Sequence, residues 1–150
     1  MDKIDRKILT ILQENCSLPV SSIAQEVGLS ASPCWKRINR MRELGIIKKE
    51  AAILDAHHLG LGLTVFVSIT TGEHSTTWLE KFSKTIIAMP EVTGFYRMAG
   101  DVDYLLKVIV SDMEAFDEFY KRLISTTALN DVTSRFSMET IKETTALPIQ

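Results

Sequence analysis

The chain of 150 residues has few of the features that mark several large classes of protein. Its two cysteines, Cys16 and Cys34, are too few for a disulfide framework and form no CxxC pair. No apolar run approaches the roughly 20 residues that a membrane-spanning helix needs. The opening stretch MDKIDRKIL alternates charged and apolar residues and lacks the continuous apolar segment of a signal peptide. These absences predict a cytoplasmic protein with no membrane partner.

The residue patterns of common catalytic and metal sites are also missing. No nucleophile and base stand at an interpretable spacing, and there is no phosphate-binding loop. His57 and His58 are adjacent, so they cannot bind one metal ion from one helix face, and no cluster of carboxylates or cysteines stands nearby. We therefore expect a protein that is not an enzyme, with no catalytic residues, no metal and no cofactor.

Charge is distributed unevenly along the chain, although the net charge is only −2. Residues 1–50 hold nine basic and six acidic residues, a net charge of +3, whereas the other hundred hold eight and thirteen, a net charge of −5. This asymmetry favours a basic head joined to a module with another task.

Two helices are predicted before residue 28. The first runs from residue 3 to about residue 15, with Asp2 as its N-cap and apolar residues every four positions. The second covers about residues 20–27. Gly28 then supplies a position that tolerates a left-handed backbone, which ends the helix.

A third helix is predicted from Ser32-Pro33 to Gly45, because a serine cap followed by proline is typical of helix starts. Its core side holds Cys34, Ile38 and Met41. The stretch IIKKEAAIL that follows is interpreted as a short strand.

The third helix concentrates positive charge, which is typical of a helix that lies in the DNA major groove. An ordinary three-helix unit with a solvated charged helix would show the charge alone, whereas here the cap, the turn, the core spacing and the charge agree. The candidate base-reading residues are Ser32, Trp35, Lys36 and Asn39. The candidate phosphate contacts are Arg37, Arg40 and Arg42.

The second half of the chain predicts a ferredoxin-like domain of βαββαβ order. The expected strands are 63–70, 91–98, 103–110 and 132–141, and the expected helices are 75–89 and about 112–123. Two helices cover only one face of a four-stranded sheet, and the other face also bears apolar residues. We therefore expect a dimer formed by sheet packing, which suits paired DNA half-sites.

Three segments follow from this division: a helix-turn-helix domain at 1–53, a hinge at 54–61 and an effector and oligomerisation domain at 62–150. Within the last, the loop AGDVDYLL could bind a small molecule. Gly100 permits close backbone approach to a carboxylate, and Asp101 and Asp103 could neutralise an ammonium group, which together suit an α-amino acid. A plain Gly-Asp hairpin turn is the equal alternative.

The chain resembles the leucine-responsive regulatory protein family (Lrp/AsnC, the feast/famine regulators). The resemblance covers nearly all 150 residues and rests on IDRKILTILQEN, IAQEVGLSASPCWKRINRMRELGIIKK and MAGDVDYLLKVIV, in matching order. It implies an α+β protein with a winged-helix-like helix-turn-helix domain and a ferredoxin-like effector domain. It also implies homodimers that assemble to octamers on double-stranded DNA, with a cytoplasmic, nucleoid-associated location.

The resemblance further implies an amino-acid effector, of leucine or methionine type, bound near the loop of residues 99–103. By position, Gly100, Asp101 and Asp103 would contact its polar head. Side-chain pocket candidates, again by position, are Met98, Leu129, Val132 and Ser134. Trp35 departs from the family pattern, since that position is commonly smaller.

Three functions are compatible with these patterns to different degrees. The leading hypothesis is a sequence-specific transcriptional regulator whose assembly and DNA binding respond to an amino acid. An architectural DNA-binding protein whose second domain only oligomerises is the alternative, and it predicts no ligand response. A ferredoxin-like metabolic enzyme is disfavoured by the missing catalytic constellation.

Overall fold

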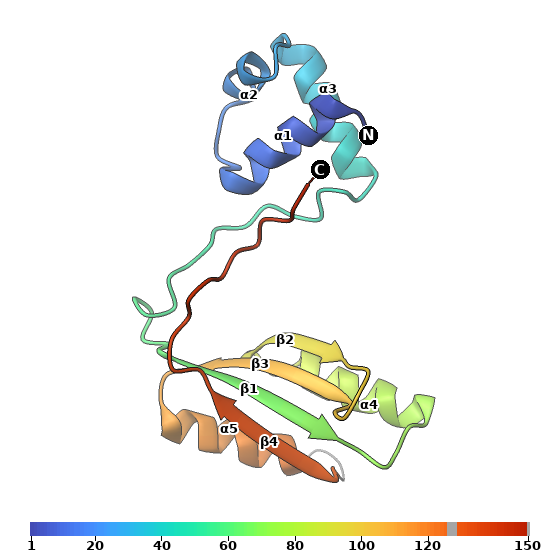
Figure 1. Ribbon diagram of the computed structural model, residues 1–150, viewed down its shortest axis with the longest axis vertical. Coiled ribbons are helices and arrows are strands. Elements are labelled where there is room, and N and C mark those ends of the chain that lie inside the picture. The colour runs from blue at the N-terminus through green and yellow to red at the C-terminus, as the bar shows by residue number, and fades with distance from the viewer. Residues whose placement is uncertain (126–128, 150) are drawn as a thin grey trace. The chain divides into compact units, whose positions relative to one another are not determined.

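A computed structural model describes residues 1–125 and 129–149 (Figure 1). The chain divides into two compact units with separate hydrophobic cores. The helical unit comprises Met1–Ile53 together with residues 141–149, and the sheet unit comprises Leu54–Thr140. The α+β class and the two predicted folds are thereby confirmed. Residues 141–149, which we expected to continue the effector domain, group with the helices.

The helical unit begins with α1 (Lys3–Glu14) and α2 (Val20–Glu26). Asp2 is the N-cap of α1, as predicted, and forms a reciprocal capping box with Asp5. The Asp5 backbone N–H donates to Asp2 Oδ1 at 2.8 Å, and the Asp2 N–H donates to Asp5 Oδ2 at 3.1 Å. Two of the N–H groups that a helix start leaves without partners are satisfied in this way.

The third helix, α3 (Ala31–Glu43), starts earlier than the sequence predicts. Its N-cap is Ser30, so Ser32 and Pro33 lie inside the first turn. Proline fits there because the first N–H groups of a helix have no partner within the helix. Gly28 lies in the turn before α3 with a φ of +71°. The prediction that Ser32 caps the helix is therefore wrong.

The strand predicted at residues 46–54 is also absent, since the described chain carries no strand between α3 and β1. A strand needs a neighbour that pairs with its backbone N–H and C=O groups, and the helical unit offers none. The helical unit is thus a three-helix head without a strand of its own.

The sheet unit follows the predicted βαββαβ order. Its elements are β1 (Leu63–Thr70), α4 (Thr76–Ile87), β2 (Val92–Arg97), β3 (Tyr104–Val110), α5 (Met113–Ser125) and β4 (Asp131–Phe136). The strands form one antiparallel sheet in the order β2-β3-β1-β4. Strand β4 ends at Phe136, short of the predicted Ile141, and Met138 beyond it is fully exposed.

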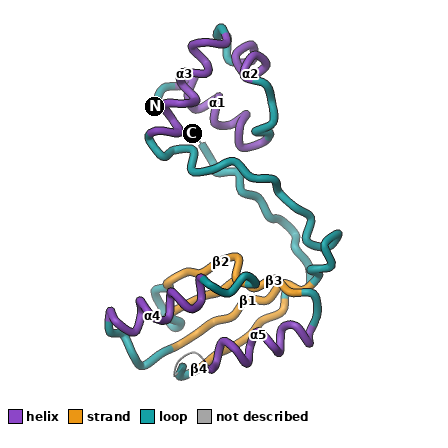
Figure 2. The backbone as a smooth tube through the Cα atoms, turned by 180° about the vertical axis from the view of Figure 1, so that it is seen from behind, coloured by secondary structure: helices purple, strands orange, loops and turns teal. Residues whose placement is uncertain are grey.

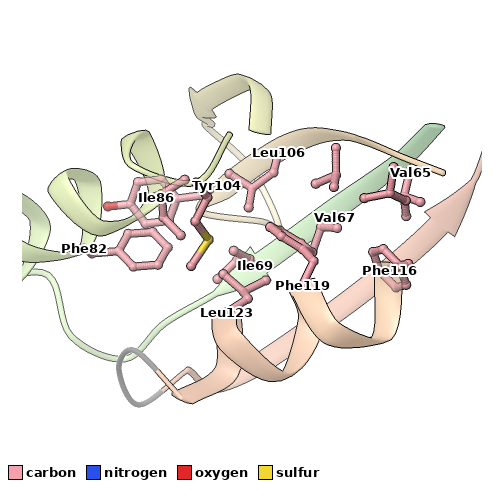
Figure 3. Packing of buried hydrophobic residues seen from close by; sticks show 13 residues of the cluster. Val65, Val67, Ile69, Phe82, Ile86, Tyr104, Leu106, Phe116, Phe119 and Leu123 are labelled. Carbon is pink, nitrogen blue, oxygen red and sulfur yellow. The ribbon is translucent and has the colours of Figure 1, made fainter. Parts of the chain in front are cut away.

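Helices α4 and α5 cover the same face of the sheet, as Figures 1 and 2 show from opposite sides. Alternate residues of β1 and β3 point toward them, and the aromatic rings of α4 and α5 fill the space between (Figure 3). The largest fully buried members of this core are Phe82, Phe119, Ile69, Ile86, Leu106 and Leu123. The opposite face of the sheet has no covering element among residues 54–125 and 129–140.

No helix within residues 1–125 and 129–149 is long and apolar enough to cross a membrane.

Candidate functional site

Helix α3 separates its buried and exposed residues cleanly, because residues three and four apart share one side of a helix. Cys34, Ile38 and Met41 are buried in the core of the helical unit, as predicted. The opposite side, here named the reading face, consists of Ser32, Trp35, Lys36, Asn39 and Arg40. All but Asn39 are exposed, and Asn39 is half-buried. The structure therefore brings five of the seven candidate DNA contacts onto one surface, and Arg37 and Arg42 lie outside it.

Trp35 is the unusual member of the reading face, since half of its surface (52%) is open to solvent. Removing a large aromatic side chain from water is favourable, and Trp35 remains exposed in this unit, so its burial would favour binding of a partner.

Arg37, a candidate outside the reading face, points along the flank of α3 toward the start of α1. Its Nη1 lies 2.6 Å from Asp2 Oδ2 and 2.7 Å from Asp5 Oδ1. Asp5 is buried, with 5% of its surface exposed, and the Arg37 side chain is partly buried. One guanidinium thus joins the recognition helix to the capping box of α1, which sequence reasoning did not foresee.

The charges in this cluster stabilise one another. Burial raises the pKa of Asp5, but the hydrogen bonds from the Arg37 guanidinium and the Asp2 N–H outweigh it, and the pKa is lowered overall. The pKa of Asp2 is also lowered, mainly by the Asp5 backbone N–H and then by Arg37. The two carboxylates in turn raise the pKa of Arg37.

These shifts predict an acid limit for the helical unit. A lowered pKa in the folded state stabilises the fold above the ordinary aspartate value, about 3.9. That stabilisation is lost as pH falls through the folded-state values. We expect the free energy of unfolding of the helical unit to decline below about pH 4, and Asp5→Asn to flatten the decline. Amide signals of α1 followed through an acid titration measure this, with α5 signals as the internal reference. An equally steep decline in Asp5→Asn would contradict the assignment.

The other basic residues of α3 differ in whether they have an ion-pair partner. Arg42 forms an ion pair with Glu50 and donates to the side-chain oxygen of Asn39 at 3.0 Å. Lys36 and Arg40 have no ion-pair partner within residues 1–125 and 129–149. They are therefore the cations of the reading face that are available to phosphate.

The second candidate region is the effector loop, residues 98–103, between β2 and β3. The Met98 N–H donates to the Asp103 C=O at 2.8 Å and closes the loop. Gly100 has a φ of +128°, a conformation that L side chains rarely adopt, with open space around it. The loop is a hairpin connection, and it also exposes the backbone of Gly100 and the side chain of Asp101.

Asp103 ties this loop to a neighbouring one. Its N–H donates to the Ile69 C=O at 3.0 Å, and its Oδ2 accepts a 2.8 Å hydrogen bond from the Thr71 N–H. The side-chain amide of Asn130 packs against Gly72, and the backbone N–H of Asn130 donates to the Thr70 C=O at 3.0 Å. Three loops therefore meet at one end of the sheet. Thr71 carried no recognisable sequence signal, because only the sheet register brings it beside Asp103.

The remaining effector candidates are divided between two places. Leu129 precedes β4 at the loop end of the sheet and packs against the core. Val132 and Ser134 instead line a groove of about 350 Å³ between α5 and β4, together with Met113, Phe116, Asp117, Tyr120 and Phe136. None of the effector-loop residues lines this groove.

The uncovered face of the sheet is partly apolar. Phe66 and Tyr96 have 38% and 56% of their surface exposed, and Arg135 donates to the buried Ser68 hydroxyl at 2.8 Å.

The predicted hinge contains an ion pair in which His58 Nδ1 lies 3.0 Å from Asp55 Oδ2. The described residues contain no cluster of three or more histidine, cysteine, aspartate or glutamate side chains that could hold a metal ion.

Comparison with known proteins matches both units. The family model described as the Lrp/AsnC ligand binding domain matches residues 64–147, and the winged helix-turn-helix DNA-binding model matches residues 1–48. The DNA-binding transcriptional activator DecR of Escherichia coli K12 is 52% identical over 151 residues, which cover 100% of this chain and 99% of DecR.

Two solved structures share the fold. An AsnC family transcriptional regulator from Agrobacterium tumefaciens superposes with a TM-score of 0.96 at 53% identity, covering 99% of this chain and 97% of its own. A transcriptional regulator from Neisseria meningitidis in complex with L-Met superposes with a TM-score of 0.94 at 36% identity, covering 99% and 96%. The chain therefore belongs to the Lrp/AsnC family of DNA-binding transcriptional regulators, as its sequence motifs predicted.

Proposed function

We propose that this regulator reads DNA with the reading face of α3 and that an α-amino acid bound at the effector loop changes its assembly on DNA. The observation that carries the proposal is the junction of three loops at one end of the sheet. There, the exposed backbone of Gly100 shares one short loop with Asp101 and Asp103, and the Asp103 carboxylate joins that loop to Thr71. An amino acid presents the complementary pair, a carboxylate and an ammonium group.

For DNA contact, Lys36 and Arg40 are the phosphate-binding candidates because no carboxylate neutralises them among the described residues. Ser32 and Asn39 can hydrogen-bond base edges, and the Trp35 ring suits apolar contact with a thymine methyl group. Arg37 retains a role in DNA binding, and its contacts with Asp2 and Asp5 favour positioning of the helix.

The effector we propose has a flexible apolar side chain, of leucine or methionine type. The relative from Neisseria meningitidis holds L-Met, and it shares 36% of its sequence with this chain. Met98, the first residue of the effector loop, is 39% exposed and supplies an apolar surface there. Leu129, Val132 and Ser134 stay candidates for the side-chain pocket, and two of them line the groove along α5.

The uncovered sheet face supports assembly. Its exposed Phe66 and Tyr96 would leave water if two sheets packed face to face, and the resulting dimer would present two copies of α3 to paired half-sites. We propose a homodimer that assembles further to an octamer, in the cytoplasm and associated with the nucleoid, with no catalytic activity and no cofactor besides the effector.

A thermal-shift screen with the common amino acids tests the effector site. A ligand at a hundredfold excess over its Kd adds about 2.7 kcal/mol to stability, so a true effector should raise the Tm of the wild type by several degrees. Asp103→Asn removes the charge but keeps an oxygen that can accept from the Thr71 N–H. We expect this variant to fold normally and to lose most of the shift.

Glu80→Gln is the matched control, because Glu80 is an exposed carboxylate on α4 that belongs to neither the effector loop nor the lining of the groove along α5. It should respond to the effector as the wild type does. If no amino acid stabilises the wild type, the architectural alternative is favoured. An unchanged response in Asp103→Asn would place the effector elsewhere.

A further inference from the structure

Residues 141–149 make a specific contact with α1, although they follow the last strand of the sheet unit. The Gln13 side-chain Nε2 donates to the Leu147 C=O at 2.9 Å, and the Leu147 N–H donates to Gln13 Oε1 at 2.9 Å. A primary amide carries the same donor and acceptor as a peptide group. Gln13 therefore pairs with Leu147 as a neighbouring strand would, with both bonds exchanged.

A second contact lies two residues further on. The Ile149 N–H donates to the Leu147 C=O at 2.9 Å, which makes a three-residue turn around Pro148. This turn directs Ile149 toward the core of the helical unit, where it is half-buried against the cluster that contains Ile8, Ile23 and Ile38. Polar pairing and apolar burial thus act at the same place.

The rest of the segment is exposed, including Ile141 and Leu147, whose side chains are 89% and 71% open to solvent. At Leu147 and Ile149, two neutral hydrogen bonds and one half-buried isoleucine are set against the entropy lost by ordering these residues. The two contributions are of similar size, so a modest influence suffices to shift docking at this end of the segment.

Residues 141–149 also affect how many chain segments connect the two units. Residues 44–62 join α3 to β1, and residues 137–140 lead from β4 directly into the docked segment (Figure 1). Docking adds a second tie between the units, and release leaves one. A head held by two ties has less conformational freedom to lose when it binds DNA, which favours binding.

We propose that residues 141–149 are a releasable strap that docks on α1 at Gln13 and raises DNA affinity by restricting the helical unit. The strap acts through DNA binding alone and does not depend on the amino-acid effector.

The test compares three variants of the full chain without any amino acid added. Gln13→Met keeps the size and neutrality of the side chain but cannot pair with Leu147, and Ile149→Ser removes the apolar anchor. Leu147→Ser is the matched control, because it deletes an exposed side chain and keeps the backbone atoms that Gln13 contacts. Hydrogen exchange at the residue 147 amide reports docking. Affinity is measured on a duplex selected by the wild type from a random pool.

We expect the residue 147 amide to be protected in the wild type and in Leu147→Ser. Protection should disappear in Gln13→Met and Ile149→Ser, with about fivefold weaker DNA binding and an unchanged dependence on salt. A wild-type amide that exchanges as fast as an unstructured one overturns the docking. Loss of protection with unaltered affinity overturns the effect on DNA binding.

Discussion

Replacing Ile38 with alanine is expected to unfold the helical unit and abolish DNA binding while the sheet unit stays folded. Ile38 is buried on α3 and belongs to a small core, in which seven of the described residues are buried. An isoleucine-to-alanine change in a core costs about 2–5 kcal/mol. A unit of this size has a total stability of only a few kcal/mol, so this loss consumes most or all of it.

The two units each contain a reporter of their own. Cys34 is buried in the core of the helical unit, where burial raises the pKa of its thiol, and Cys16 is exposed. In a Cys16→Ser background, modification of Cys34 by a thiol reagent therefore measures opening of the helical unit. Trp78 packs against the core of the sheet unit, so its fluorescence in a Trp35→Phe background follows that unit.

The converse substitution completes the experiment. Phe119→Ala removes a fully buried ring from the other core, at a cost of about 3–5 kcal/mol, and should shift the Trp78 transition while Cys34 stays protected. Among residues 1–125 and 129–149, no residue belongs to both clusters, which is the physical basis for expecting independence. Simultaneous loss of both signals in either variant would mean that the units fold as one.

Sequence reasoning succeeded where the structure depends on local periodicity. Residues of α1 and α3 that recur every three or four positions are the buried ones, because helix geometry alone places them on one side. The alternating sequence LTVFVSIT of β1 was equally readable, and Val65, Val67 and Ile69 are fully buried there. The predicted N-cap Asp2 also depends only on nearby backbone.

It failed where a residue's role depends on a distant partner. The segment at 46–54 has strand-like composition but no strand to pair with, so it remains irregular. The ion pairs of Arg37 with Asp2 and Asp5 were not foreseen, because only the packing of α1 against α3 brings those carboxylates within reach of it. The contact of Leu147 with Gln13 spans 134 positions of sequence and leaves no periodic signal.

The candidate effector site contains features that the sequence predicts and features that it does not. Gly100 and Asp103 stand in a short loop whose turn chemistry is readable, and the structure keeps them together. Thr71 joins them through the pairing of β1 with β3, which composition does not encode. Ser134 lies on the helix-facing side of β4, apart from that loop, because the strand register decides which way it points.

Arg40→Ala and Arg37→Met should both weaken DNA binding strongly, but with different dependence on salt. Arg40 is exposed and has no carboxylate partner among the described residues, so its loss removes a phosphate contact. The slope of log K against log salt should then fall by about one. Arg37 is already neutralised by Asp2 and Asp5, so its loss should lower affinity at every salt concentration and leave the slope unchanged.

A rescue experiment separates positioning from phosphate contact at Arg37. Arg37→Met leaves the buried Asp5 carboxylate without its partner, which is the costly situation, whereas removing both charges is nearly neutral. Adding Asp5→Asn to Arg37→Met should therefore restore much of the affinity. Glu14→Gln in the same background removes an exposed negative charge from α1 and measures the general electrostatic gain. If Asp5→Asn restores no more than Glu14→Gln does, and the Arg37→Met slope falls as the Arg40→Ala slope does, then Arg37 contacts phosphate directly.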